Sequence, residues 1–230
     1  MTTISERWAK VSARVDAACR RAKRRPADVT IVAVSKTHPA SSVLEAAAAG
    51  ATDFGENYAQ ELADKIANVA MAPDLGALRW HYIGRLQRNK ARFVAGHVAL
   101  VHAVETVELA EELAKRAAGV VQPILLAVNL AGETTKGGVT AEGAATAARA
   151  LAAVPGVRLD GLMTMPPYSD DPEASRPQFE ALRDLRERLV EDLGLPLPVL
   201  SMGMSGDFEV AIECGATHVR VGTAIFGTRS

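Results

Sequence analysis

Residues 46–58, AAAAGATDFGENY, place a helix end, a glycine and a short apolar strand in one continuous run. The alanines favour helix, and Gly50 suits the position just after a last helical turn. Residues 211–225, AIECGATHVRVGTAI, follow the same order around Gly215. We interpret the two runs as the shared chemistry of a βα unit and not as a functional repeat. A unit of this kind, recurring along a chain, is typical of α/β proteins.

The same alternation continues through the rest of the chain. Strands are predicted at 30–35, 51–55, 80–84, 100–103, 124–129, 157–162, 198–201 and 218–221. Helical stretches are predicted between them at 41–49, 58–69, 88–94, 107–118, 141–152, 172–192 and 208–214. Glycines that suit helix C-termini precede five of these strands, at Gly50, Gly119, Gly156, Gly194 and Gly215.

Eight strands alternating with helices predict a single (β/α)₈ TIM barrel over residues 1–230. Helical spacing of Ile4, Trp8, Val11, Val15 and Ala18 adds an extra N-terminal helix. A doubly wound open sheet is the alternative, and it is disfavoured because no GxGxxG turn follows the first strand.

The charge, the apolar runs and the cysteine content of the sequence exclude several classes of function. Lys and Arg total 26 against 27 Asp and Glu, and a net charge of -1 gives no field that attracts nucleic acid or a membrane. The N-terminus lacks the apolar region of a signal peptide, and no apolar run reaches the length of a membrane span. Two cysteines form no metal motif and suit a reducing compartment, so we expect a cytoplasmic protein without metal. With no second domain expected, we predict a monomer.

The barrel prediction gives meaning to residues 30–39, TIVAVSKTHP, in which Lys36 ends the first strand. Active sites of such barrels lie at the C-terminal ends of the strands. Closure places strands two and eight beside the first, so Asn57 and Arg220 should flank Lys36. The loops after strands seven and eight, SMGMSGD (201–207) and GTA (222–224), offer the backbone N–H groups and hydroxyls that hold phosphate. Together they predict a phosphorylated aldehyde held as an imine on a desolvated, nucleophilic lysine.

Each of these residues also has a purely structural interpretation. Lys36 could be a strand-end lysine whose ammonium reaches solvent, and Ser205 could cap a helix. His81 could be a hydrogen-bonded core histidine, Asn57 a turn residue, and Arg220 one half of a structural pair. The methionines at 163, 165, 202 and 204 fit an apolar lining better than a ligand set.

The segments AVSKTHP, FGENYAQEL, WHYIGRLQRNK, GLMTMPP and LSMGMSGDFEVAIECGATHVRVGTAIFG resemble the YggS/PROSC family, the pyridoxal phosphate homeostasis proteins. The resemblance runs from about Thr30 to Gly227. It implies a barrel similar to the N-terminal barrel of alanine racemase and covalently bound pyridoxal 5′-phosphate (PLP). The chain departs from many members at Arg85 and near residues 136–138.

The resemblance also implies a role for each site residue. Lys36 forms the Schiff base with PLP. Ser201, Ser205, Gly222 and Thr223 hold the phosphate, and Arg220 faces the pyridine nitrogen. Asn57 and Met202 line the ring pocket, with His81 nearby.

Three functions remain open from the sequence. The first is a carrier or buffer that holds PLP and releases it to apo PLP-dependent enzymes, without strong turnover. The second is a weak PLP-dependent amino-acid racemase or lyase that uses Lys36 as acid and base. The third is a PLP-free Schiff-base aldolase for a phosphorylated sugar. Arginine at the pyridine nitrogen makes the ring a weak electron sink, which favours the first.

Overall fold

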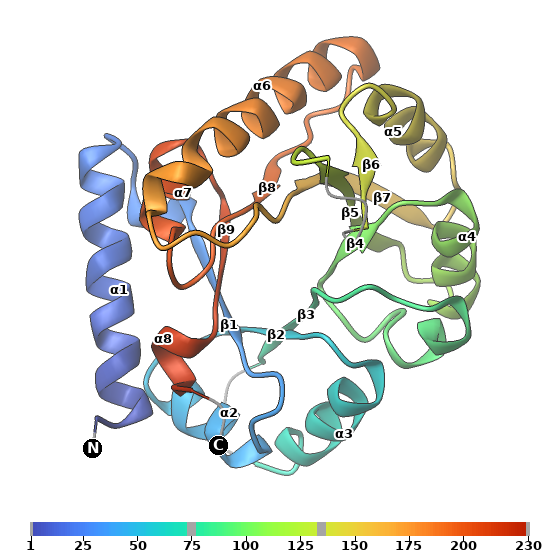
Figure 1. Ribbon diagram of the computed structural model, residues 1–230. Coiled ribbons are helices and arrows are strands. Elements are labelled where there is room, and N and C mark those ends of the chain that lie inside the picture. The colour runs from blue at the N-terminus through green and yellow to red at the C-terminus, as the bar shows by residue number, and fades with distance from the viewer. Residues whose placement is uncertain (1, 73–76, 133–136, 229–230) are drawn as a thin grey trace.

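The barrel is formed by eight parallel strands around a common axis (Figure 1). The computed structural model describes residues 2–72, 77–132 and 137–228 of the chain. The strands are β1 (Thr30–Val34), β2 (Asp53–Glu56), β3 (Arg79–Tyr82), β4 (Leu100–Val104), β5 (Gln122–Asn129), β7 (Val157–Met163), β8 (Val199–Ser201) and β9 (His218–Val221). Pairing runs in the order β4-β3-β2-β1-β9-β8-β7-β5, and β4 also pairs with β5, which closes the barrel. The predicted (β/α)₈ TIM barrel is confirmed.

Helices cover the outside of the barrel (Figure 1). They are α2 (Ala40–Ala48), α3 (Ala59–Val69), α4 (Val107–Arg116), α5 (Ala144–Ala152), α6 (Arg176–Leu193), α7 (Phe208–Glu213) and α8 (Thr223–Phe226). Helix α1 (Ile4–Arg21) is the predicted extra helix, and it packs outside the ring against α2, α7 and α8. The five glycines expected at helix ends all have positive φ, between 65° and 102°. None of the helices among the described residues is long and apolar enough to cross a membrane.

Four segments differ from the sequence prediction. The helix expected at 88–94 is a 3₁₀ helix, Arg88–Phe93, which buries little besides Ala91 and so lacks the apolar stripe that sustains an α-helix. The helix expected at 172–192 begins with a 3₁₀ turn, Pro172–Ser175. A further short strand, β6 (Val139–Thr140), pairs with the C-terminal end of β5. A third 3₁₀ turn, Pro26–Asp28, precedes β1.

Side chains alternate between the two faces of the barrel wall, as strand geometry requires. Outward-facing residues such as Phe54, Val101 and Leu162 form the main apolar core with the helices. Inside the barrel the lining divides into two halves. The apolar half comes from β4, β5 and β7 and consists of Leu100, Leu125, Ala127 and Met163. The polar half consists of Asp53, His81, His102, Ser201, His218 and Arg220.

Candidate functional site

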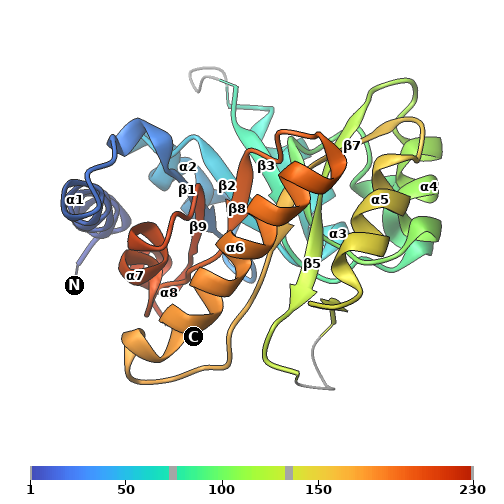
Figure 2. The same cartoon turned by 90° about the horizontal axis from the view of Figure 1, so that it is seen from above.

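A cavity of about 650 Å³ opens at the C-terminal ends of the strands. Figure 2 shows the barrel from its side, and there the arrow of β5 points to the face where α8 lies. The wall of the cavity includes apolar side chains from β1, β5 and β7 and polar ones from the loops that follow the strands. The cavity lies where the barrel prediction expects a site.

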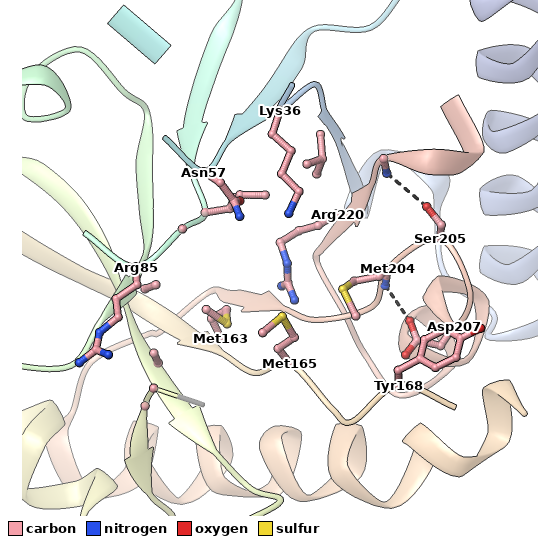
Figure 3. Close-up of a pocket in the computed structure, with 18 of the residues that line it drawn as sticks. Lys36, Asn57, Arg85, Met163, Met165, Tyr168, Met204, Ser205, Asp207 and Arg220 are labelled. Atoms are coloured by element: carbon pink, nitrogen blue, oxygen red, sulfur yellow. Dashed lines mark hydrogen bonds between the residues drawn. The ribbon is translucent and has the colours of Figure 1, made fainter. Parts of the chain in front are cut away.

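Lys36 lies at this cavity because of its position after β1. It has the same parity as Val34, which also lines the cavity, so both side chains are directed inward. Figure 3 shows the lysine side chain extending into the space between Asn57 and Arg220. The backbone turns sharply after it, since Thr37 has a φ of 68°.

A cluster of charged side chains forms hydrogen bonds with Ser35 and Thr37, the residues before and after Lys36 in the sequence. Lys65 Nζ donates to the backbone oxygen of Ser35 (2.6 Å), to Glu56 Oε1 (2.6 Å) and to Glu61 Oε1 (2.7 Å). The Ser35 hydroxyl donates to Glu56 Oε1 at 2.6 Å, and Glu61 Oε1 accepts from the Thr37 backbone N–H at 2.6 Å. We call Ser35, Glu56, Glu61 and Lys65 the Lys65 cluster.

In the Lys65 cluster, the two oxygens of the Glu56 carboxylate differ in their hydrogen bonding. Burial raises the pKa of Glu56, and the hydrogen bonds from Lys65 and Ser35 act against that rise. Glu56 Oε2 is buried without a hydrogen-bond partner among the described residues. No sequence motif predicts this cluster, because Glu56 and Lys65 lie on different elements, β2 and α3.

Arg220 forms part of the cavity floor. It donates from Nη1 to the Ser201 hydroxyl (2.7 Å) and from Nη2 to the Thr164 carbonyl (3.0 Å). Burial lowers the pKa of Arg220 to about 10, while Asp207 acts in the opposite direction. The guanidinium therefore remains charged at neutral pH and presents donors to the cavity.

The loops after β8 and β9 meet at one end of the cavity. Ser205 Oγ accepts from the backbone N–H groups of Gly222 (3.2 Å) and Ala224 (3.3 Å), and Asp207 Oδ1 accepts from Met204 N–H (2.7 Å; Figure 3). The turn requires glycine at 203, where φ is +90° and an added Cβ would lie 2.5 Å from the Ala211 Cβ. The two loops together gather hydroxyl and N–H groups at one place, as a phosphate site requires.

Six of the nine predicted residues line the cavity: Lys36, Asn57, Ser205, Arg220, Gly222 and Thr223. Met202 does not line it. It comes directly after β8, and its side chain lies in the main apolar core between barrel and helices, where it is fully buried. Met204, two residues on, lines the cavity instead.

Ser201 and His81 also lie away from the cavity wall. The Ser201 hydroxyl is bonded to Arg220 and His102 inside the barrel, so the structure does not place it where a phosphate-binding hydroxyl is expected. His81 is buried and bonded through both ring nitrogens, as the core interpretation of this residue anticipates.

The opposite rim carries residues that the sequence analysis left without a role. Arg85 Nε lies 3.3 Å from Glu105 Oε1, and Glu105 Oε2 accepts from the Gly138 N–H. In Figure 3 the Arg85 side chain extends away from Arg220. Lys136 lies outside the described residues. No group of three or more His, Cys, Asp or Glu suited to a metal ion occurs in the described ranges.

The interior histidines predict acid sensitivity. Burial lowers the pKa of His218 to about 3, and that of His102 well below its usual value. Between pH 6.5 and 3 the unfolded chain binds a proton at His218 that the folded protein does not, so stability falls as the pH is lowered. We expect a loss of about 1–2 kcal/mol between pH 7.5 and 5 from this partly buried residue. Urea unfolding at both pH values should show that loss reduced in His218→Phe, and equal losses in both proteins would contradict the assignment.

The fold and the site together define a (β/α)₈ barrel whose cavity combines a strand-end lysine, a floor arginine and a hydroxyl-lined loop pair. The family model for the alanine racemase N-terminal domain matches residues 10–230. The chain is 47% identical over 232 residues to the pyridoxal phosphate homeostasis protein of Pseudomonas aeruginosa, covering 100% of this chain and 97% of that one. It is 44% identical over 226 residues to the protein of the same name from Aquifex aeolicus, covering 97% of each.

A solved structure is similar to this chain over nearly its whole length. PipY of Synechococcus elongatus, with PLP bound, matches with a TM-score of 0.83 and 35% identity, over 98% of this chain and 100% of that one. The chain belongs to the pyridoxal phosphate homeostasis protein family, within the alanine racemase N-terminal domain group.

Proposed function

We propose that this protein binds PLP in the barrel cavity and takes part in intracellular PLP homeostasis, as a carrier or buffer without strong catalytic turnover. One observation carries the proposal: Lys36, Arg220 and the paired loops at Ser205 and Gly222 converge on a single cavity. The relatives named pyridoxal phosphate homeostasis protein and the PLP-bound PipY structure support it.

The residues present fit the chemical groups of PLP. Lys36 supplies an amine for a Schiff base with the aldehyde. Arg220 would supply charged N–H donors for the pyridine nitrogen, and Asn57 would line the space for the ring. Ser205, Gly222 and Thr223 supply hydroxyl and backbone donors for the phosphate.

The same floor arginine argues against efficient turnover. When bound, PLP supplies an electron sink for carbanion chemistry, and a protonated pyridine nitrogen strengthens that sink. Arg220 stays charged at neutral pH, so it would offer the ring nitrogen a hydrogen-bond donor and would disfavour a proton there. Racemisation also needs a second acid–base group across the substrate from Lys36.

None of the three tyrosines, all within the described ranges, is suited to that second role. Tyr58 is more than half exposed and does not line the cavity. Tyr82 donates to the Asn57 carbonyl at 2.8 Å, and burial raises the pKa of Tyr82 to about 12. Tyr168 lies at the rim with its hydroxyl donating to Asp170 at 2.7 Å, and this bond raises the pKa of Tyr168.

A weak PLP-dependent racemase or lyase is the second candidate, because Lys36 alone could exchange a proton. It predicts incorporation of deuterium at Cα of an amino acid in D₂O with PLP-loaded protein. Absence of exchange across a broad amino-acid panel ends this candidate, whereas sustained turnover of any common amino acid contradicts the carrier function.

The setting of the function is part of the proposal. Two free cysteines, Cys19 and Cys214, are both buried and unbridged, which suits a reducing cytoplasm. Apo PLP-dependent enzymes are the proposed recipients, and a monomer is the proposed state. Sedimentation of the PLP-loaded protein measures the latter, and a dimer mass would contradict it.

The deciding experiment is a visible spectrum of the purified protein after addition of PLP. A yellow Schiff-base band is expected, and borohydride should convert it to a stable adduct that peptide mass mapping assigns to Lys36. Transfer should then be followed as recovery of activity by an apo PLP-dependent enzyme. A protein that stays colourless with excess PLP would overturn the proposal and favour the PLP-free aldolase.

A further inference from the structure

A row of polar side chains crosses the barrel interior beneath the cavity floor. Arg220 Nη1 lies 2.7 Å from Ser201 Oγ, which lies 2.8 Å from His102 Nδ1. His102 Nε2 lies 3.0 Å from His81 Nδ1, and His81 Nε2 lies 2.9 Å from Asp53 Oδ1. All five side chains are buried. We call these residues the Arg220 chain.

When both imidazole rings are neutral, the two ends of the Arg220 chain determine the direction of every hydrogen bond in it. Arginine has only donors, so Ser201 Oγ accepts from Arg220. At the other end, hydrogen bonds from His81, Arg79 and Thr52 outweigh burial and hold the pKa of Asp53 below its usual value. Ionised Asp53 is an acceptor only, and His81 Nε2–H must therefore donate to it.

The middle of the chain follows from the chemistry of neutral imidazole, which has one donor and one acceptor nitrogen. With His81 Nε2 as a donor, His81 Nδ1 accepts from His102 Nε2–H. His102 Nδ1 then accepts, and the Ser201 hydroxyl proton points to it. Every group has a matching partner, and both histidines carry the proton on Nε2.

This direction leaves Ser201 a single role toward Arg220. Because its proton is committed to His102, its oxygen lone pair faces the guanidinium. The Thr164 carbonyl accepts from the other terminal nitrogen. Two acceptors from two strand ends thus hold the guanidinium plane on the cavity floor.

We propose that Ser201, His102 and His81 are positioning residues that orient the Arg220 guanidinium as a fixed donor toward the pyridine nitrogen of PLP. This inference rests on the proposed function. It gives a role to three buried side chains, Ser201, His102 and His81, that do not line the cavity. The residues act through Arg220 and do not touch the ligand.

The first test examines the hydrogen bonds of the Arg220 chain in protein to which no PLP has been added. Long-range ¹H–¹⁵N spectra of the histidine rings at neutral pH should show His102 and His81 both protonated at Nε2. In Ser201→Ala, the His102 Nδ1 resonance should shift because it loses its donor. A wild-type His102 protonated at Nδ1 would overturn the proposed direction of the chain.

The second test measures the dissociation constant of PLP. Ser201→Ala and His102→Phe are each expected to weaken binding about tenfold, the scale of one charge-assisted hydrogen bond. His218→Phe is the matched control, since its ring lies 6.2 Å from that of His102 but is outside the chain, and it should bind PLP as the wild type does.

The outcomes separate this inference from the proposed function. Unchanged PLP affinity in Ser201→Ala, a small change that preserves the barrel wall, overturns the positioning role even if His102→Phe does not fold. An equal loss in His218→Phe overturns it as well, because the effect would then be general to the interior. Wild-type protein that does not bind PLP overturns the proposed function itself. The ¹H–¹⁵N spectra of the histidine rings would still show whether the hydrogen bonds of the Arg220 chain are present.

Discussion

Lys36→Ala is expected to lose the Schiff-base band and all borohydride-stable PLP label. The reason is that Lys36 is the lysine whose side chain extends into the cavity between Asn57 and Arg220 (Figure 3). Residual binding through Arg220 and the paired loops should remain, weaker by at least about a hundredfold, on the order of 3 kcal/mol. Absorbance and a PLP titration measure both quantities.

The matched variant is Lys36→Arg, which keeps a cation of similar reach but cannot form an imine. It should lack the band as alanine does, while retaining more of the noncovalent affinity because the charge still faces the phosphate. Adduct formation at another lysine in either variant, with an unchanged band, would show that the cavity lysine is not the attachment point.

The second large effect concerns stability. Lys65→Met is expected to lower the free energy of unfolding by about 3–5 kcal/mol, the cost of removing one partner of a buried ion pair. Lys65 and Glu56 are both buried, and the ammonium contacts Glu56, Glu61 and the Ser35 carbonyl. Denaturant unfolding at neutral pH measures the loss, and Lys10→Met on an exposed part of α1 serves as the control, expected within about 0.5 kcal/mol of wild type.

The pH dependence of Lys65→Met identifies the cause. Burial already raises the pKa of Glu56, and without the ammonium it should rise further. Above pH 4.5 the unfolded chain ionises Glu56 while the folded variant keeps its proton, so the variant should lose stability as the pH rises. Adding Glu56→Gln should remove that dependence and recover part of the loss. A pH-independent loss would attribute the effect to packing instead.

Lys65→Met should also affect PLP binding, because the Lys65 cluster includes Ser35 and accepts a hydrogen bond from Thr37, the two residues on either side of Lys36. The cluster thereby links the stability of the β1–β2 wall to the placement of the reactive amine. This link is invisible in the sequence, since Lys65 belongs to the third helix and has no motif in common with TIVAVSKTHP.

The site was predicted best where a residue follows directly from its strand. Lys36, Arg220 and Gly222 are reached by counting to the end of a strand, and they line the cavity. Met202, which the family resemblance places at the ring pocket, does not line the cavity: it follows a three-residue strand, and a shift of one residue moves a side chain to the other face of the wall. His102 was overlooked, although the alternation in LVHAV places it on the same face as Leu100.

The sequence by itself determined the order of strands and helices, the glycines that end the helices, and the lysine at the end of the first strand. These features depend on local propensity and spacing, which a short window contains. Only the tertiary structure decided that His102 meets Ser201, 99 residues away, and that Lys65 holds the residues beside Lys36. Such contacts depend on barrel closure and on the register between strands, and both are set by packing of the whole chain rather than by any local segment.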